Sequence, residues 1–379
     1  MNNERVKVLV NIYLDKYDDL IRKGNDTRDK WAAVSCCVKQ WDLGAEHFRD
    51  MYAMSMKKAV PLMEEGASRP VEGILMLCDS GREEQVRNAF DALLAPDGGD
   101  ISQRQDRIVQ FVKQINAMLE EEAPAMWHYN HKIRTAIRYL SFIRPQENYY
   151  FSAADAAAFC GYTEVEEEIG FDKQLRLQNY YHVCDDLAEY LMTREDLRAK
   201  LARSLELKAK ECGDPDLSGI DPRMHIMAAD LMISAYRSGF YAEKAANRKS
   251  RISTSSQRRI ERMMQRAKFL NEREKIVDSF DEIVALERQN EIPDLAGHTA
   301  LHESFGEGVI KEQTGRYLLI DFGTVTKKFA LPGVVLNGYL TFEGEDIAGK
   351  CLLMQEVEKK RKEIENKLTS VDVQLQMLE

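Results

Sequence analysis

Apolar residues recur at spacings of three and four along most of this chain, and this helical period limits the fold more than any other feature. It dominates residues 5–292, with further stripes over 31–65, 71–94 and 108–119. The first stripe ends near Gly24 and contains Val6, Leu9, Val10, Tyr13, Tyr17 and Leu20. Turn-rich segments at 95–102 and 212–222 separate helices, and 144–151 is the one extended segment expected here. Residues 1–240 are therefore predicted to form one large helical domain.

Composition narrows the class of protein further. The chain has 379 residues, of which 44% are apolar and 31% charged, a balance typical of a globular protein with charged helical faces. Its apolar stretches are far shorter than the ~20 residues that span a bilayer, and its start lacks the layout of a signal peptide. We therefore expect a cytoplasmic protein. The seven cysteines are irregularly spaced without a C-x-x-C pair, which favours reduced thiols over disulfides or a zinc site.

A basic segment interrupts an otherwise acidic chain. The net charge is −10, yet residues 244–275 contain eleven Lys and Arg against three Glu, a local charge of +8. Residues 241–292 are predicted to form a basic linker followed by an amphipathic helix. Ser255 or Ser256 is the expected N-cap of that helix. Seven cations could neutralise phosphates of a nucleic acid: Arg248, Lys249, Arg251, Arg258, Arg259, Arg262 and Arg266. The alternative is a solvated face, or a stripe paired with carboxylates elsewhere in the chain.

The closing segment, residues 346–379, has the strictest periodicity. Spacings of three and four alternate from Met354 to Leu378, with Arg361 as the single misfit. This pattern predicts a coiled-coil helix that pairs with its own copy, as a homodimer, or with the helix at 257–288; the alternative is a helix packed on the body. The predicted oligomerisation residues are Met354, Val357, Ile364, Leu368, Val371, Leu375 and Leu378.

Residues 296–345 break the helical pattern. The runs "GVIKEQ" and "RYLLIDF" flank a turn at Thr314-Gly315, which indicates a hairpin, and "VTKKFALP" predicts a third strand that ends at Pro332. Gly306 and Gly308 suit a tight bend. The segment is predicted to form a small SH3-like or tudor-like β-barrel whose exposed docking surface carries Lys311, Arg316, Lys327 and Lys328. Phe305, Phe322 and Phe329 would build the barrel itself.

This segment resembles a known family. The pattern His-x-x-Phe-Gly-x-Gly-x-Val/Ile, with the following hairpin and Lys-rich strand, is similar over residues 302–342 to the barrel at the C-terminus of UvrD/PcrA-type helicases. The resemblance implies a module that docks on RNA polymerase or nucleic acid.

A second resemblance covers residues 30–234. The order of helices and aromatic landmarks, from "KWAAVSCCVKQW" to "DPRMHIMAADLMI", is similar to the helical region that precedes the AAA+ motor of McrB-like restriction GTPases. The Walker A loop of that family, G-x-x-x-x-G-K-[ST], is absent from the chain. The resemblance therefore implies a recognition portion without its motor, which would be a separate subunit.

Three groups of residues have side chains of the types that catalysis or metal binding requires. His128 and His131 have a metal-ligand spacing beside Trp127, and folding could bring His182 or Asp185 to them as a third ligand, but partly buried histidines near an aromatic cluster are the simpler interpretation. Cys36 and Cys37 are expected in the core. Glu206, Lys208 and Asp216 supply the residue types of a metal-dependent nuclease in the wrong order.

The sequence thus predicts a mainly helical protein with one small barrel and no catalytic residues, metal or cofactor. We expect a bacterial adaptor that binds nucleic acid or a nucleic-acid-processing machine, in phage defence or DNA repair. A metal-dependent nuclease or other enzyme hidden in the helical domain, and a protein-only scaffold, are the two alternatives.

Overall fold

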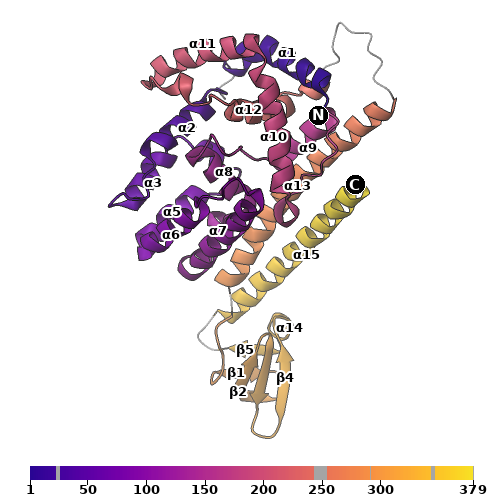
Figure 1. Cartoon of the computed structure of the whole chain (residues 1–379). Coiled ribbons are helices and arrows are strands. Elements are labelled where there is room, and N and C mark those ends of the chain that lie inside the picture. The colour runs from indigo at the N-terminus through magenta and orange to yellow at the C-terminus, as the bar shows by residue number, and fades with distance from the viewer. Residues whose placement is uncertain (23–25, 243–253, 291, 343–345, 379) are drawn as a thin grey trace. The chain divides into compact units, whose positions relative to one another are not determined.

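A computed structural model describes residues 1–22, 26–242, 254–290, 292–342 and 346–378. The chain divides into two compact units, which are described separately. Unit 1 comprises Met1–Ala123, His128–Glu274 and Val371–Glu379, and unit 2 comprises Pro124–Trp127 and Lys275–Ser370. The mainly helical class, with a small curled sheet before a final helix, is confirmed (Figure 1).

The described residues of unit 1 form helices joined by turns and loops. Besides the first part of α13 and the last turns of α15, it contains short single-turn helices and α1 (Asn3–Leu20), α2 (Asp29–Gln40), α3 (Phe48–Met56), α4 (Val60–Met63), α5 (Pro70–Leu77), α6 (Glu83–Leu93), α7 (Ile101–Glu122), α8 (Ile133–Ile143), α9 (Ala153–Tyr162), α10 (Leu177–Met192), α11 (Glu195–Cys212) and α12 (His225–Arg237). No helix of the described chain is long and apolar enough to cross a membrane.

Local sequence signals fix several helix ends. Asp100 caps α7, because its carboxylate accepts the backbone N–H groups of Ser102 and Gln103 that have no partner inside the helix. Gly213 ends α11 at φ 66°, a conformation that glycine adopts without steric cost.

Two of the predicted stripes are broken. Residues 31–65 form α2, α3 and α4 rather than one continuous helix, and residues 71–94 form α5 and α6 joined at Gly81, whose φ is 84°. The breaks have visible causes. A turn forms at 42–45, where the Asp42 carboxylate accepts the N–H of Gly44, and Pro61 lies in the first turn of α4.

The core of unit 1 is an aromatic cluster around Phe90. Ring centroids of Trp41, Phe111 and Tyr139 lie 5.1, 4.9 and 5.1 Å from that of Phe90, mostly edge to face. Helices α2, α6, α7 and α8 contribute these rings directly or from their ends. Burial of the apolar stripes found in the sequence therefore holds unit 1 together.

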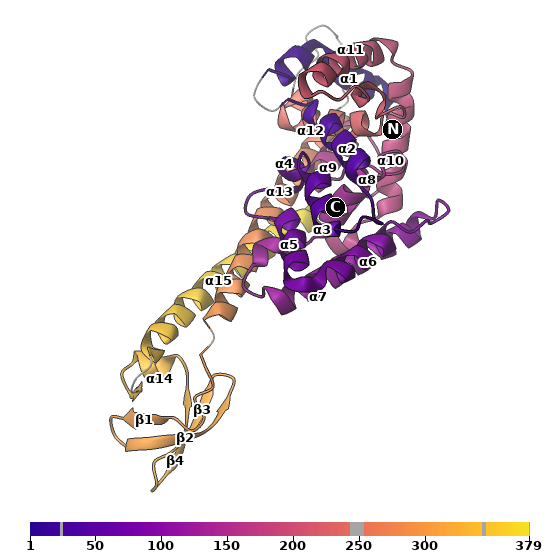
Figure 2. The ribbon, with the colours of Figure 1, turned by 90° about the vertical axis from the view of Figure 1, so that its left-hand side faces the viewer.

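Unit 2 combines a helical hairpin with a sheet. Two long helices, α13 (Thr254–Gln289) and α15 (Ile347–Met377), contribute their adjoining halves to this unit and run side by side in Figures 1 and 2. Arg361 of α15 forms a 2.9 Å ion pair with Glu287 of α13, and its guanidinium lies 5.7 Å from the Phe280 ring centroid. Arg361, the one charged residue in the apolar stripe of α15, thus has its charge partner on α13.

The sheet is inserted between these two helices. Its strands are β1 (Thr299–His302), β2 (Gly306–Thr314), β3 (Tyr317–Asp321), β4 (Thr326–Ala330) and β5 (Leu340–Phe342), in the antiparallel order β4-β3-β2-β1-β5. A bulge between Ile310 and Glu312 shifts the β2–β3 register. The short helix α14 (Gly333–Leu336) connects β4 to β5. Ala300, Ile310, Leu318, Ile320 and Leu340 form the buried face of this sheet.

Candidate nucleic-acid interface

Strand β4 carries two exposed cations of the predicted docking surface, Lys327 and Lys328. Lys327 Nζ lies 5.8 Å from the ring centroid of Phe305, and Lys328 Nζ lies 4.3 Å from that of Tyr317. The two rings are themselves 41% and 48% exposed. Within the described part of the chain, neither lysine forms an ion pair with a carboxylate. Both ammonium groups therefore lie beside aromatic rings at the edge of the sheet, open to an anionic partner.

The other two cations of this surface are paired. Lys311 Nζ lies 3.5 Å from a carboxylate oxygen of Asp321 on the neighbouring strand. The Arg316 guanidinium forms an ion pair with Glu358 of α15. The four predicted docking residues thus differ in electrostatic state: two are neutralised by carboxylates, and the two on β4 are not.

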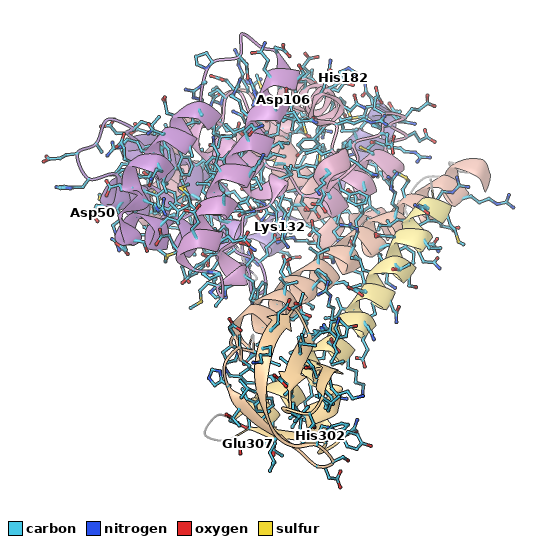
Figure 3. The ribbon with its side chains drawn as sticks, turned by 90° about the horizontal axis from the view of Figure 1, so that it is seen from below. Asp50, Asp106, Lys132, His182, His302 and Glu307 are labelled. Carbon is cyan, nitrogen blue, oxygen red and sulfur yellow. The ribbon has the colours of Figure 1, made fainter. Side chains whose placement is uncertain are left out.

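Aromatic side chains fill the open end of the curled sheet. The His302 ring lies 4.7 Å from that of Phe305 and 5.0 Å from that of Phe329, and Phe322 packs on both phenylalanines. Figure 3 places His302 and Glu307 at this end. Gly308 is required here, because a Cβ would lie 2.5 Å from the Phe322 ring. Phe322 and Phe329 pack against the sheet core, as expected of residues that build it.

Only part of the basic segment lies within the described residues. Arg258 and Arg262 are exposed on α13, whereas Arg266 has its guanidinium 3.9 Å from the Glu168 carboxylate. Arg248, Lys249 and Arg251 lie outside the described residues, as does the side chain of Arg259. The described cations of this helical face therefore differ: Arg258 and Arg262 are exposed and Arg266 forms an internal pair, and phosphate binding by the segment stays a prediction.

The apolar stripe of α15 is covered along its length. Val357, Val371 and Leu375 are buried, and Met354, Ile364, Leu368 and Leu378 are partly buried. In unit 1, Asp372 of this helix accepts a 2.8 Å hydrogen bond from Arg273 of α13. The stripe therefore lies against its own chain, and pairing with a second copy stays a prediction.

A groove of about 450 Å³ opens in unit 2 beside the β2–β3 turn. Its apolar wall consists of Val284, Leu286, Ile292, Leu331, Met354 and Val357. Two ion pairs, Arg316 with Glu358 and Arg361 with Glu287, line it together with the side-chain amides of Asn290 and Gln313. The groove brings together Arg316, Met354 and Val357, which the sequence assigned to two separate surfaces.

Sequence reasoning missed Glu287, Asn290, Gln313 and Glu358 as groove residues. They come from α13, the turn after it, β2 and α15, and only the folded unit brings them together. One signal in the sequence could have found them. Arg361 occupies an apolar position of the stripe, which indicates a charged partner or a polar cavity beside this residue.

Of the two candidate ligands, His131 lies in the core of unit 1, whereas His128 is only partly buried. His131 is buried, with Nδ1 3.1 Å from the Tyr129 carbonyl oxygen and Nε2 3.2 Å from the Tyr139 hydroxyl, which is 2.7 Å from that of Tyr52. The carbonyl can only accept, so Nδ1 carries the proton and Nε2 accepts from Tyr139. Burial lowers the pKa of His131 to about 3. His131 is therefore a neutral, fully hydrogen-bonded core residue.

The candidate nuclease residues do not gather. Lys208 pairs with Asp26 and Asp29 at 2.8 and 2.7 Å, and Asp216 pairs with Lys39 at 2.9 Å. Among the residues that the structure describes, no group of three or more His, Cys, Asp or Glu could hold a metal ion. Cys37 is buried and Cys36 is partly exposed.

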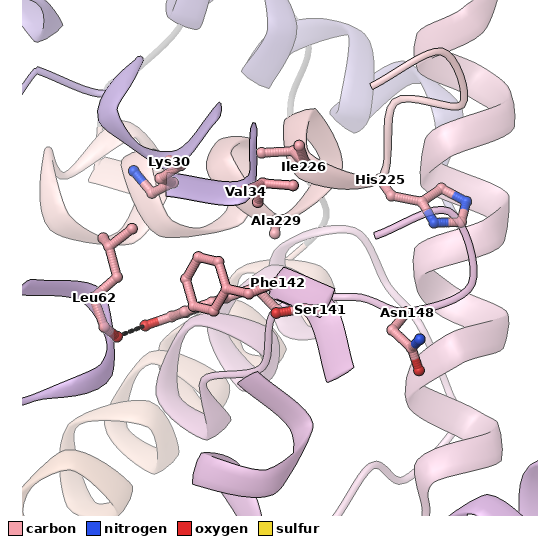
Figure 4. A pocket seen from close by; sticks show the side chains of 10 residues that line it. Lys30, Val34, Leu62, Ser141, Phe142, Asn148, His225, Ile226 and Ala229 are labelled. Carbon is pink, nitrogen blue, oxygen red and sulfur yellow. Dashed lines mark hydrogen bonds between the residues drawn. The ribbon is translucent and has the colours of Figure 1, made fainter. Parts of the chain in front are cut away.

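A void of about 20 Å³ near Lys30 and His225 is too small for a substrate and has room for about one water (Figure 4). Lys30 forms a 2.7 Å ion pair with the fully buried Asp230. His225 Nδ1 lies 3.0 Å from the Pro145 carbonyl oxygen. The polar groups around this void are thus committed to internal contacts.

No family model, curated protein or solved structure matches this chain. Interpretation of the interface therefore depends on the contacts described above.

Proposed function

We propose that this chain is a non-catalytic adaptor whose small sheet binds nucleic acid in the service of a nucleic-acid-processing machine. The observation that carries the proposal is the edge strand β4, where Lys327 and Lys328 lie beside the exposed rings of Phe305 and Tyr317 without carboxylate partners among the described residues. Lysines bind the phosphate backbone, and exposed rings stack with unpaired bases.

The same segment supports an SH3-like or tudor-like barrel. Five short antiparallel strands curl around one apolar core, and a single helical turn, α14, separates the last two strands. We propose that this barrel is the docking module and that the exposed Arg258 and Arg262 of α13 add phosphate contacts.

The proposal is tested by fluorescence anisotropy of labelled single-stranded and duplex oligonucleotides across a salt series. Changing Lys327 and Lys328 together to Glu should weaken binding to single strands at least about tenfold. The slope of log K against log salt should fall by about 1.4, since each phosphate contact to a single strand contributes about 0.7.

The matched control changes Lys359 and Lys360 of α15, two exposed neighbouring lysines, to Glu. It introduces the same charge and should leave binding nearly unchanged. An equal loss in both variants would assign binding to net charge, and no binding even at low salt would leave the protein-only scaffold as the better explanation.

One observation favours that scaffold. Arg266, Arg316, Arg361 and Lys311 all lie beside carboxylates of the same chain, so much of the positive charge is used internally. A scaffold would dock proteins through the exposed Leu301, Val309 and Tyr339 of the sheet region instead.

A further inference from the structure

The groove of unit 2 has the size of a small-ligand site. Its volume of about 450 Å³ lies within the range of about 300–1,000 Å³ that is usual for pockets holding small molecules. Its wall is apolar, with Val357 and Leu331 buried and Met354 partly buried. A flat apolar group could therefore be accommodated there with most of its surface removed from water.

Two side-chain amides supply hydrogen-bonding groups at this wall. Gln313 Oε1 accepts the backbone N–H of Leu295 at 2.9 Å, so its NH₂ group remains a donor. Asn290 Nδ2 donates to the Leu286 carbonyl at 2.8 Å, so its Oδ1 remains an acceptor. Within the described residues, neither remaining group has a protein partner. One donor and one acceptor beside an apolar wall match the edge of a nucleobase, which offers both.

In both ion pairs of the groove the arginine is the more exposed partner. The side chains of Arg316 and Arg361 are 53% and 43% exposed, and those of their partners Glu358 and Glu287 are 24% and 27% exposed. The four charges sum to zero, but the two guanidinium groups are more accessible to an anion than their carboxylate partners. Guanidinium groups bind phosphate through paired hydrogen bonds, so they suit the phosphate of a nucleotide.

The groove adjoins the segment that contacts Lys328 of β4. Lys328 lies against Tyr317, which follows Arg316 directly in the chain, and the carbonyl of Arg316 accepts the N–H of Leu331 at 2.8 Å. Leu331 is part of the apolar wall. A strand bound along β4 would therefore reach the groove through Tyr317 and Arg316.

From these contacts we propose that the groove holds one nucleotide of a single-stranded nucleic acid. The base lies on the apolar wall against Asn290 and Gln313, and the phosphate is held at Arg316 and Arg361. This inference rests on the proposed function, because the lysines of β4 bring the strand to the groove.

Isothermal titration calorimetry tests the groove separately from the strand. The full chain is titrated with AMP, GMP, CMP and UMP, and with ribose 5-phosphate, which lacks the base. We expect at least one nucleotide to bind with a Kd below about 1 mM. Ribose 5-phosphate should bind at least about tenfold more weakly, because it makes no contact with the apolar wall or the amides.

Three variants locate the site. Val357→Phe places a ring in the groove and should abolish nucleotide binding, whereas Leu352→Phe, on the exposed face of the same helix, should not alter it. Asn290→Ala removes the acceptor Oδ1 and should weaken nucleotide binding about tenfold. This smaller change still tests the groove if the Val357→Phe variant fails to fold. Circular dichroism melting checks the fold of each variant.

The outcomes separate this inference from the proposed function. If oligonucleotide binding needs Lys327 and Lys328 but no single nucleotide binds, the inference that the groove holds a nucleotide is wrong, and the proposed adaptor function still stands. Nucleotide binding unaffected by Val357→Phe and Asn290→Ala, or ribose 5-phosphate binding as tight as a nucleotide, would also overturn that inference. Nucleotide binding that survives the Lys327→Glu and Lys328→Glu changes but is lost in Val357→Phe supports it.

Discussion

Individual hydrogen bonds in the core of unit 1 form a directed chain. Tyr52 donates to Tyr139, Tyr139 donates to Nε2 of His131, and Nδ1–H of His131 donates to the Tyr129 carbonyl. Each member of this chain is satisfied only while His131 is neutral, since a protonated Nε2 would face a donor. The arrangement makes the aromatic core sensitive to acid at a single residue.

We predict a pH-dependent contribution of His131 to stability. Its pKa is about 3 in the folded chain and about 6.5 when exposed, so between these values the unfolded chain binds more protons. The free energy of unfolding should therefore fall by roughly 1.4 kcal/mol for each pH unit of acidification from about 6.5 towards 3. This contribution is fully present above pH 6.5.

The measurement compares urea denaturation of the native chain and His131→Gln between pH 7.5 and 4.5. Burial raises the pKa of Asp155 and Asp221 to about 6, so these two carboxyls stabilise the folded chain as the pH falls. They are present in both proteins, so the difference between the two stability curves isolates the effect of His131. The native chain should lose stability faster on acidification than the variant. Parallel curves would show that His131 is not held neutral.

At the scale of elements, close contact between α9 and α13 depends on one glycine. A Cβ at Gly161 of α9 would overlap the Cβ of Met263 of α13, an atom too near the backbone to move independently. We predict that Gly161→Ala destabilises the chain by about 1–3 kcal/mol, although alanine is the better helix former by about 1 kcal/mol.

Chemical denaturation and hydrogen exchange measure this effect. Exchange should accelerate in α13 around Met263, because the helix must move to accept the methyl group. Gly219→Ala is the matched control, since nothing lies within 4 Å of its added Cβ. If the Gly161→Ala variant is more stable than the native chain, the gain in helix propensity exceeds the cost of the added methyl group, and α9 and α13 are not in close contact at this position.

Elements could be predicted from the sequence where local signals are strong. The hairpin at Thr314-Gly315, the strand that ends before Pro332 and the helix over 257–288 each have a periodicity and a boundary residue. Strands β1 and β5, with four and three residues, are too short to show a period, and β1 was not expected. Strand β1 pairs with the edge of the longer β2, and β5 then pairs with β1, so both depend on contacts between segments distant in the chain.

The interface was less predictable than the elements. Arg266 and Glu168 are nearly a hundred residues apart, and Arg316 and Glu358 lie on a turn and a helix, so no local pattern reveals either pair. Charge in the sequence shows where cations lie but not which of them fold beside a carboxylate. In the sequence, Lys311, Lys327 and Lys328 are equivalent cations. In the structure, Lys311 lies beside Asp321, whereas Lys327 and Lys328 form no ion pair among the described residues.

At the scale of the whole molecule, unit 1 is completed by a distant segment. Val371 and Leu375 of α15 are 5% and 4% exposed, while Val373 and Met377 of the same turns are 41% and 73% exposed. Changing Val371 and Leu375 together to Ser should lower the free energy of unfolding of unit 1 by about 4 kcal/mol, because both lose buried apolar surface.

The matched control changes Val373 and Met377 to Ser and should have little effect. Thermal denaturation gives the size of the loss, and hydrogen exchange should locate it at residues 262–273 of α13, near the Arg273 pair with Asp372. An equal, small effect in both variants would show that unit 1 is stable without this segment.

The order of units along the chain has a consequence for synthesis. Nearly a hundred residues, almost the whole of unit 2, separate Glu274 from Val371. A ribosome therefore produces the sheet and the helical hairpin before it produces the residues that finish unit 1. During that interval the apolar surface that Val371 and Leu375 later cover stays open to water, chaperones and neighbouring nascent chains. The sheet can therefore fold before the residues that complete the packing of unit 1 have been synthesised.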